Sequence, residues 1–174
     1  MPENQKSSAF KVAIGGLLLA LTIIFIYLES VLPTGRLSLY ALSSFTVSII
    51  IIEFRAGFGW VFYTAACLLS LIVVPDKISV VPYAAFFGVY GIIKYYIETI
   101  RGKWLGWIFK LVFFNIALTA AILFLKEFLL QKLGFSVKLW LAVILLEVVF
   151  VIYDIVYSSF IRLYKTRFGR NIPR

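Results

Sequence analysis

Charged side chains inside apolar stretches are the residues of this chain that offer the most chemistry. Lys110, Glu147 and Asp154 each lie within a long run of apolar residues. A charge in a membrane-spanning helix costs ~2.5–3.5 kcal/mol, so each of these residues needs a partner or a function. The sequence contains no histidine, which excludes Ser-His-Asp triads, Cys-His pairs, HExxH zinc sites and bis-histidine haem. We therefore expect no catalytic residue, no metal and no cofactor, in a protein that is not an enzyme.

A first group of polar residues is expected to hold helices together. Lys110 lies six residues into the apolar run 104–125, and Asp154 lies seven residues before the end of the run 139–161. Both are therefore about 10 Å from the same face of a membrane, which predicts an ion pair. The group extends to Lys94 and Glu98 near that face and to Asn115 about one turn deeper. We predict a structural polar belt, with a proton relay as the alternative.

A second group predicts a ligand site in the opposite half of the membrane. Glu147 has no basic residue at its depth in any other apolar run, and Glu29 closes the first run on the same side, so we expect neither carboxylate to have a cationic partner. Aromatic residues at helical spacing share one face of the fourth run: Tyr83, Phe87 and Tyr90. Pro82 precedes them and should free backbone groups for a cavity. Carboxylates and aromatic rings suit a flat ligand that is cationic or bears an amine. The alternative is a protonated or water-facing Glu147 and a solvated Glu29, with rings that pack or face lipid.

The composition shows which elements must position these residues. Of the 174 residues 63% are hydrophobic and 14% charged, whereas soluble domains have about 45–50% apolar and about 25% charged residues. This excludes both a soluble and a disordered protein. Breaks in the apolar pattern predict six membrane-spanning helices, at residues 12–29, 37–53, 56–74, 78–99, 104–125 and 139–161. The expected fold is an all-α membrane protein, a compact bundle of six helices in a single integral membrane domain over residues 1–174.

Basic residues predict how the helices are oriented. If the N-terminus is inside, the cytoplasmic segments hold eleven Lys and Arg residues and the outer segments five, with Lys110 inside the membrane. Positive charge collects on the cytoplasmic side, so we expect both termini there. The net charge of +9 then indicates contact with anionic lipid headgroups rather than with nucleic acid.

Small residues on the first helix predict where helices touch. Ala13, Gly16 and Ala20 are spaced so that they form one stripe. Such stripes let helix backbones approach closely in lipid. The stripe therefore predicts either packing inside the bundle or a docking surface for another membrane subunit.

These features together resemble the S components of energy-coupling-factor vitamin transporters. The resemblance rests on six spans in 174 residues, the stripe on the first helix, the Leu32-Pro33 turn and the start of the third span at residues 55–59. The family pattern of the stripe favours alanines, and Ala13, Gly16 and Ala20 match it approximately. The stretch 86–94, with Glu98, Lys110 and Asn115, is similar to an uncharacterised group of Firmicutes membrane proteins.

The resemblance implies a substrate-capture subunit in a bacterial plasma membrane. Its stripe would dock onto a coupling subunit, and its small ligand, a vitamin or micronutrient, would bind in the outer half of the bundle. Energy must come from separate ATPases, because the chain has no GxxxxGK[ST] phosphate-binding loop. The alternative is a membrane scaffold, such as a cell-shape or envelope-assembly protein, which would bind protein partners and no small ligand. A channel is a further alternative, although no ring of like charges lines a candidate pore.

Overall fold

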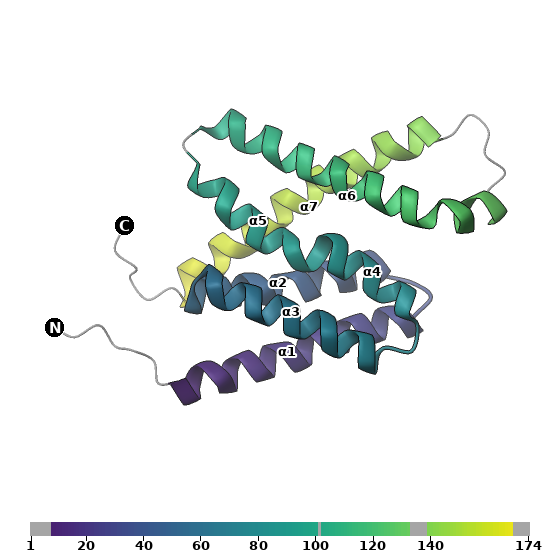
Figure 1. The fold of residues 1–174 in the computed structure, drawn as a ribbon. Coiled ribbons are helices and arrows are strands. Elements are labelled where there is room, and N and C mark those ends of the chain that lie inside the picture. The colour runs from purple at the N-terminus through teal and green to yellow at the C-terminus, as the bar shows by residue number, and fades with distance from the viewer. Residues whose placement is uncertain (1–7, 101, 133–138, 169–174) are drawn as a thin grey trace. The chain divides into compact units, whose positions relative to one another are not determined.

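The computed structural model describes residues 8–100, 102–132 and 139–168, and all the regular structure within them is helical. The chain divides into two compact units, residues 1–96 and 97–174. The helices are α1 (Ser8–Val31), α2 (Arg36–Phe54), α3 (Ala56–Val73), η1 (Lys77–Ser79), α4 (Val80–Pro82), η2 (Tyr83–Phe87), α5 (Gly88–Thr99), α6 (Lys103–Lys132) and α7 (Leu139–Phe168) (Figure 1). The expected single domain over 1–174 stays a prediction.

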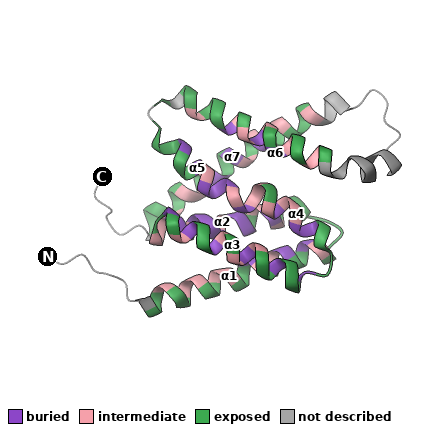
Figure 2. Cartoon of the chain, in the orientation of Figure 1, coloured by how far each residue is buried: buried purple, intermediate pink, exposed green. Residues whose placement is uncertain are grey.

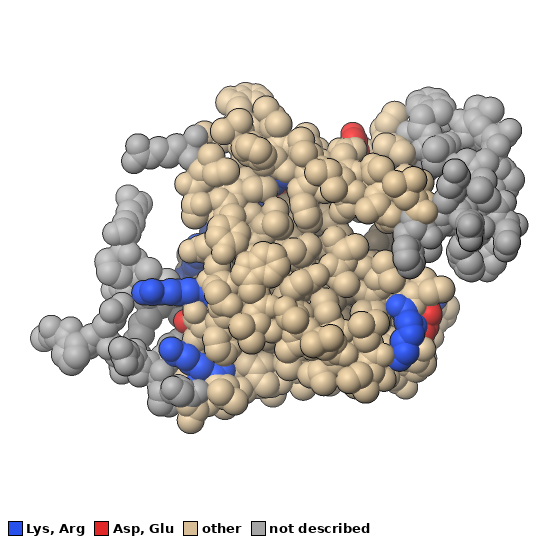
Figure 3. All heavy atoms as spheres, in the orientation of Figure 1, with Lys and Arg blue, Asp and Glu red and all other residues tan. Residues whose placement is uncertain are grey.

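Six stretches of the described chain are long and apolar enough to cross a membrane. They are Ala9–Val31, Arg36–Phe54, Ala56–Val73, Lys77–Thr99, Trp104–Leu123 and Val143–Arg167. The predicted number of spans is confirmed, and it indicates a multi-pass membrane protein. Over α1 to α3, charged side chains lie at the two ends of the helices, and uncharged side chains cover the face between them (Figure 3). The orientation stays a prediction, and some basic residues behind it lie outside the described chain: Lys6, Arg101, Lys138, Arg170 and Arg174.

Short connections hold α1, α2 and α3 against one another in the first unit. Gly35, just before α2, has φ of 77°, a left-handed conformation that glycine adopts without steric cost. Arg55 joins α2 to α3 with φ of 76°, which is unfavourable for a residue with a side chain. Its N–H still bonds to the Ile51 carbonyl at 3.0 Å and its carbonyl accepts from Gly59 at 3.3 Å. The backbone therefore reverses at one residue while both helix ends keep hydrogen-bond partners.

The inner faces of these helices combine apolar packing with small hydroxyl groups. Ile26, Tyr40, Ala66 and Tyr83 belong to one buried cluster, from four different elements. The Oγ1 atoms of Thr22 on α1 and Thr46 on α2 are 2.6 Å apart. Further buried hydroxyls on α2 bond to carbonyls of their own helix, as Ser43 does to Tyr40 at 2.7 Å. Such local bonds satisfy the hydroxyl without a partner helix, and small side chains let the helices approach closely. Buried residues accordingly concentrate on α2 (Figure 2).

The fourth span consists of consecutive short 3₁₀, α and π segments followed by α5, rather than of one regular helix. It begins as the 3₁₀ turn η1, and the side chain of Asp76 caps this turn by accepting from the Ile78 N–H at 3.0 Å. The turn passes through α4 into η2, a π-helical segment that starts directly after Pro82. Proline supplies no N–H, which breaks the regular ladder. The predicted break at Pro82 is thus present, and α5 resumes the regular helix at Gly88.

In the second unit α6 and α7 cross and pack through large side chains. Phe114 of α6 stacks on Phe150 of α7, with ring centroids 4.4 Å apart and an interplanar angle of 9°. Both rings are buried. Most other apolar side chains of these two helices are exposed, as expected for helices that face lipid.

Candidate functional site

The first candidate site lies where α1 ends and α2 begins, and we call it the Glu29 cluster. It consists of Glu29 on α1, Tyr40 on α2, Ser70 on α3 and Ser79 on η1. The contact between Thr22 and Thr46 sets the register of the antiparallel helices α1 and α2. Seven residues further along α1 is Glu29 (22 + 7), and seven residues back along α2 is residue 39 (46 − 7), next to Tyr40. The Tyr40 hydroxyl accordingly interacts with the Glu29 carboxylate.

A second register places Ser70 at nearly the same level. A Cβ atom on Gly15 would lie 3.5 Å from the ring of Phe58, and α1 and α3 run parallel. Moving 14 residues along both helices leads from Gly15 to Glu29 and from Phe58 to Ile72 (58 + 14). Ser70 is two residues before Ile72, which is about 3 Å of helix rise. Ser70 also lies between Ala66 and Val74, two members of the buried cluster that contains Ile26 and Tyr40.

Glu29 is a buried carboxylate that is only partly satisfied. Its side chain is 3% exposed, and its Oε1 lies 3.8 Å from Nε of Arg36. Its Oε2 is buried without a hydrogen-bond partner in the described residues, and so is Oγ of Ser70. A buried carboxylate is stable only when cations or hydrogen-bond donors surround it. The expectation that Glu29 lacks a cationic partner is thus corrected, since Arg36 approaches one of its two oxygens.

Tyr40 and Tyr63 bond to the carbonyls that the irregular fourth span leaves available. Pro82 lacks an N–H, and the next N–H, that of Tyr83, bonds to the Val80 carbonyl. The Ser79 carbonyl instead accepts the Tyr40 hydroxyl at 2.5 Å. Tyr63 of α3 likewise donates to the Ala84 carbonyl in η2 at 2.6 Å. The expected release of backbone groups occurs, and side chains of this chain bind these two carbonyls.

The structure packs the predicted aromatic residues closely against their neighbours. Tyr83 is fully buried and Phe87 contacts the same cluster. The ring of Phe87 stacks on Tyr40, with centroids 5.0 Å apart. Tyr90 is also buried, and its ring lies 5.3 Å from Phe86. The π-helical turn shifts these side chains relative to a regular α-helix, because its backbone bonds run i→i+5. A ligand site lined by Tyr83, Phe87 and Tyr90 stays a prediction.

The second unit holds the Lys110 cluster, which consists of Glu98, Lys110 and Asp154. Nζ of Lys110 lies 3.1 Å from Oδ2 of Asp154 and 3.1 Å from Oε1 of Glu98. Lys110 and Asp154 are buried, whereas the side chain of Glu98 is 46% exposed. The predicted ion pair between Lys110 and Asp154 is therefore present, at a distance within the ordinary range of N–H···O hydrogen bonds.

The other members of the predicted belt are Lys94 and Asn115. Lys94 is in the first unit, buried, with its Nζ 5.9 Å from the ring centroid of Tyr90. Asn115 donates to the Leu111 carbonyl at 3.0 Å and to Oε1 of Glu147 at 3.5 Å. Sequence reasoning placed Asn115 in the belt and Glu147 in the ligand site, but the structure brings these two together. The joint role of the five belt residues stays a prediction.

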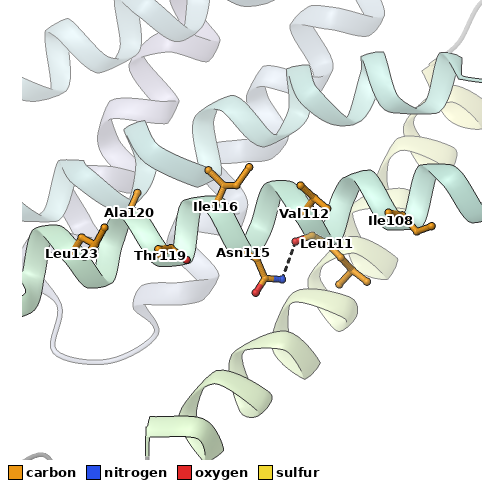
Figure 4. Close-up of a pocket in the computed structure, with 8 residues that line it drawn as sticks. All are labelled: Ile108, Leu111, Val112, Asn115, Ile116, Thr119, Ala120 and Leu123. Atoms are coloured by element: carbon orange, nitrogen blue, oxygen red, sulfur yellow. Dashed lines mark hydrogen bonds between the residues drawn. The ribbon is translucent and has the colours of Figure 1, made fainter.

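Glu147 belongs to the second unit and Glu29 to the first. Glu147 is half-buried and contacts Asn115 through one long hydrogen bond. A groove of about 690 Å³ runs along α6 from Ile108 to Leu123, and Asn115 and Thr119 supply the polar groups of its lining (Figure 4). A ligand site that includes both Glu147 and Glu29 stays a prediction.

The small-residue stripe of α1 lies on an exposed face. Ala13, Gly16 and Ala20 are all exposed, and a Cβ atom on Gly16 would have no neighbour within 4 Å. The half of α1 around them carries exposed and half-buried residues (Figure 2). Within the first unit the stripe is therefore not covered by α2 or α3, and both its packing in the bundle and its docking onto a partner stay predictions.

Sequence reasoning missed Ser70 and Ser79 and gave Arg36 no role at the site. Ser70 follows Ala66 and precedes Val74 at four-residue intervals, on the buried face of α3. A hydroxyl on the buried face of an apolar helix is a usable signal, because such groups need a partner. Ser79 contributes a backbone carbonyl, which side-chain types do not reveal.

Neither a search for metal-binding clusters in the described residues nor the comparisons with known proteins add to this description. Among the described residues no group of three or more Cys, Asp or Glu side chains is placed to hold a metal ion. Comparisons with protein-family models, curated proteins and solved structures found no match to the chain. The geometry of the two clusters therefore carries the functional argument.

Proposed function

We propose that this chain is a substrate-capture membrane subunit for the uptake of a small micronutrient or vitamin. It would reside in a bacterial plasma membrane with both termini cytoplasmic and would catalyse no reaction. The observation that carries the proposal is Glu29, a buried carboxylate with one oxygen that has no hydrogen-bond partner in the described chain. Such an atom is costly unless a ligand supplies its donor.

The surroundings of Glu29 support a binding role. Desolvated oxygens of Glu29 and Ser70 are available as acceptors, and Tyr40 holds the neighbouring turn in place through the Ser79 carbonyl. A few polar groups fixed by a packed apolar frame are typical of small-molecule sites. Glu29 is two residues from the end of α1, so it lies near one membrane face. On the predicted orientation this is the outer face.

Uptake against a gradient needs an energy source in other subunits. The exposed face formed by Ala13, Gly16 and Ala20 supports docking of a coupling subunit, which would connect this chain to ATPases. The scaffold hypothesis uses the same exposed face for other protein partners. The two functions differ in one respect, since a scaffold needs no small ligand at Glu29.

Native mass spectrometry of the full chain, purified gently from its own membrane, tests ligand capture. We expect a reproducible small adduct on the wild type, its loss in Glu29→Gln, and its retention in the matched control Glu53→Gln near the other end of α2. The midpoint of thermal unfolding shows that each variant is folded. An adduct that persists in Glu29→Gln, or a wild type that carries none, contradicts the proposal and favours the scaffold.

Substitution of Gly16 tests the docking face. Gly16→Ile should prevent co-purification with ATPase subunits, because a branched side chain keeps the partner backbone away. Gly57→Ile is a matched control, since a Cβ atom on Gly57 also has no neighbour within 4 Å. An intact complex in Gly16→Ile contradicts docking through this face.

A further inference from the structure

We propose that Arg36 is a built-in competitor for the ligand, and that the ligand binds Glu29 through a protonated primary amine. This inference rests on the proposed capture function and adds the chemical class of the ligand and the regulation of its site. In the ligand-free chain the Arg36 guanidinium stands beside Oε1 of Glu29 and neutralises part of its charge. The incoming ammonium group displaces Arg36 and binds the oxygens that Arg36 leaves unsatisfied.

The contacts of Arg36 are those of a loosely held side chain. Its Nε is 3.8 Å from Oε1 of Glu29 and 3.4 Å from the carbonyl of Leu32. Ordinary N–H···O hydrogen bonds measure about 2.7–3.2 Å. The Arg36 side chain is 55% exposed whereas that of Glu29 is 3% exposed. The guanidinium can therefore move into water while the carboxylate cannot.

The backbone keeps Arg36 next to the site. Arg36 is the first residue of α2, directly after Gly35, whose left-handed φ of 77° sets the direction in which α2 starts. The arginine thus stays within reach of Glu29 when the two separate. A tethered group has a high effective concentration, so even a weak contact competes measurably with a free ligand.

The two unsatisfied atoms define what the ligand must bring. Oε2 of Glu29 is an acceptor, and Oγ of Ser70 can accept as well. Both are buried, and Glu29 is two residues from the end of α1 whereas Ser70 is three residues from the end of α3. A primary ammonium group has three N–H donors and a positive charge, which satisfies both oxygens. A metal ion such as Ca²⁺ needs about six to eight oxygen ligands, more than this pair supplies.

Binding of propylammonium chloride to the full chain in lipid nanodiscs tests the inference. The affinity follows from the rise of the unfolding temperature with ligand concentration, at constant ionic strength set by tetramethylammonium chloride, which has no N–H donor. We expect Arg36→Gln to bind propylammonium about fivefold more tightly than the wild type. The matched control Lys77→Gln, which removes a positive charge at the same end of the unit, should change the affinity less than about twofold.

Two further variants locate the binding group. Glu29→Gln should abolish binding, and Ser70→Ala, which keeps the carboxylate, should weaken it about threefold through the loss of one acceptor. Equal affinities of Arg36→Gln and wild type overturn the competition, and equal stabilisation by sodium chloride overturns the amine class. Neither result affects the native adduct on which the capture function depends. If propylammonium binds no variant while the native adduct is lost in Glu29→Gln, the amine class is wrong and the capture function stands.

Discussion

The two buried carboxylates Glu29 and Asp154 are equally hidden from water but differ in how they are satisfied. Both residues are 2% exposed. Asp154 has a lysine nitrogen at 3.1 Å on the neighbouring helix, whereas the nearest cation of Glu29 is an exposed arginine at 3.8 Å. One oxygen of Glu29 has no donor within the described residues. Asp154 thus joins two helices, whereas Glu29 has a buried acceptor oxygen that the described chain leaves unpaired.

The comparison matters because the cost of a buried charge must be met somewhere. In the Lys110 cluster the partner is part of the fold, so the free energy of unfolding depends on it. In the Glu29 cluster the fold supplies a partial partner, so a ligand can improve the site without displacing a strong bond. Substitution of a structural carboxylate should therefore lower mainly the free energy of unfolding, whereas substitution of a binding carboxylate should lower mainly the affinity for the ligand.

Loss of the lysine should have the largest effect. Lys110→Met keeps the length of the side chain but removes the ammonium group 3.1 Å from the buried Asp154, which costs ~3–5 kcal/mol in the free energy of unfolding. Thermal or denaturant unfolding in detergent measures this loss. The exposed Lys165→Met is the control. The double variant Lys110→Met with Asp154→Asn should recover most of the stability, and a loss below about 1 kcal/mol in the single variant would mean that the pair adds little to the fold.

Removal of the Tyr40 hydroxyl should have an intermediate effect. Tyr40→Phe leaves the buried carbonyl of Ser79 without its 2.5 Å donor, which costs ~1–3 kcal/mol. The same unfolding measurement applies. Tyr95→Phe, at an exposed position of α5, is the control. Unchanged stability of Tyr40→Phe would show that the Ser79 carbonyl finds another donor.

Neutralisation of Glu29 should affect stability much less than it affects binding. Glu29→Gln removes an ionic contact of 3.8 Å and also the cost of burying a charge, so we expect the free energy of unfolding to change by less than about 1 kcal/mol. Asp154→Asn, the same chemical change in the Lys110 cluster, should be clearly more destabilising. Similar losses in the two variants would remove the distinction between the clusters.

Glu147 should show the smallest effect on stability. Its contact with Asn115 is 3.5 Å long and half-buried, so Glu147→Gln should change the free energy of unfolding by less than about 0.5 kcal/mol. The sequence placed Glu147 in the ligand site, and the native adduct tests that placement. Weaker retention of the adduct in Glu147→Gln would assign Glu147 to the site, and unchanged retention would leave Glu29 as the binding carboxylate.

The sequence by itself determined features that depend on position along a helix. The rise per residue is constant, so equal depths predicted that Lys110 faces Asp154, and the apolar lengths predicted six spans. The break at Pro82 followed from the missing N–H of proline. Each of these inferences needs only the position of a residue along its helix.

Tertiary structure decided what depends on rotation about the helix axes and on neighbouring elements. Packing of α1 against α2 and α3 buried Glu29 with one oxygen unsatisfied and left Ala13, Gly16 and Ala20 exposed. The side chain of Tyr40, from another helix, bound the carbonyl that Pro82 had freed. Neither result follows from residue type, because a polar atom is satisfied or left open according to which atoms the folded chain brings within about 3 Å of it.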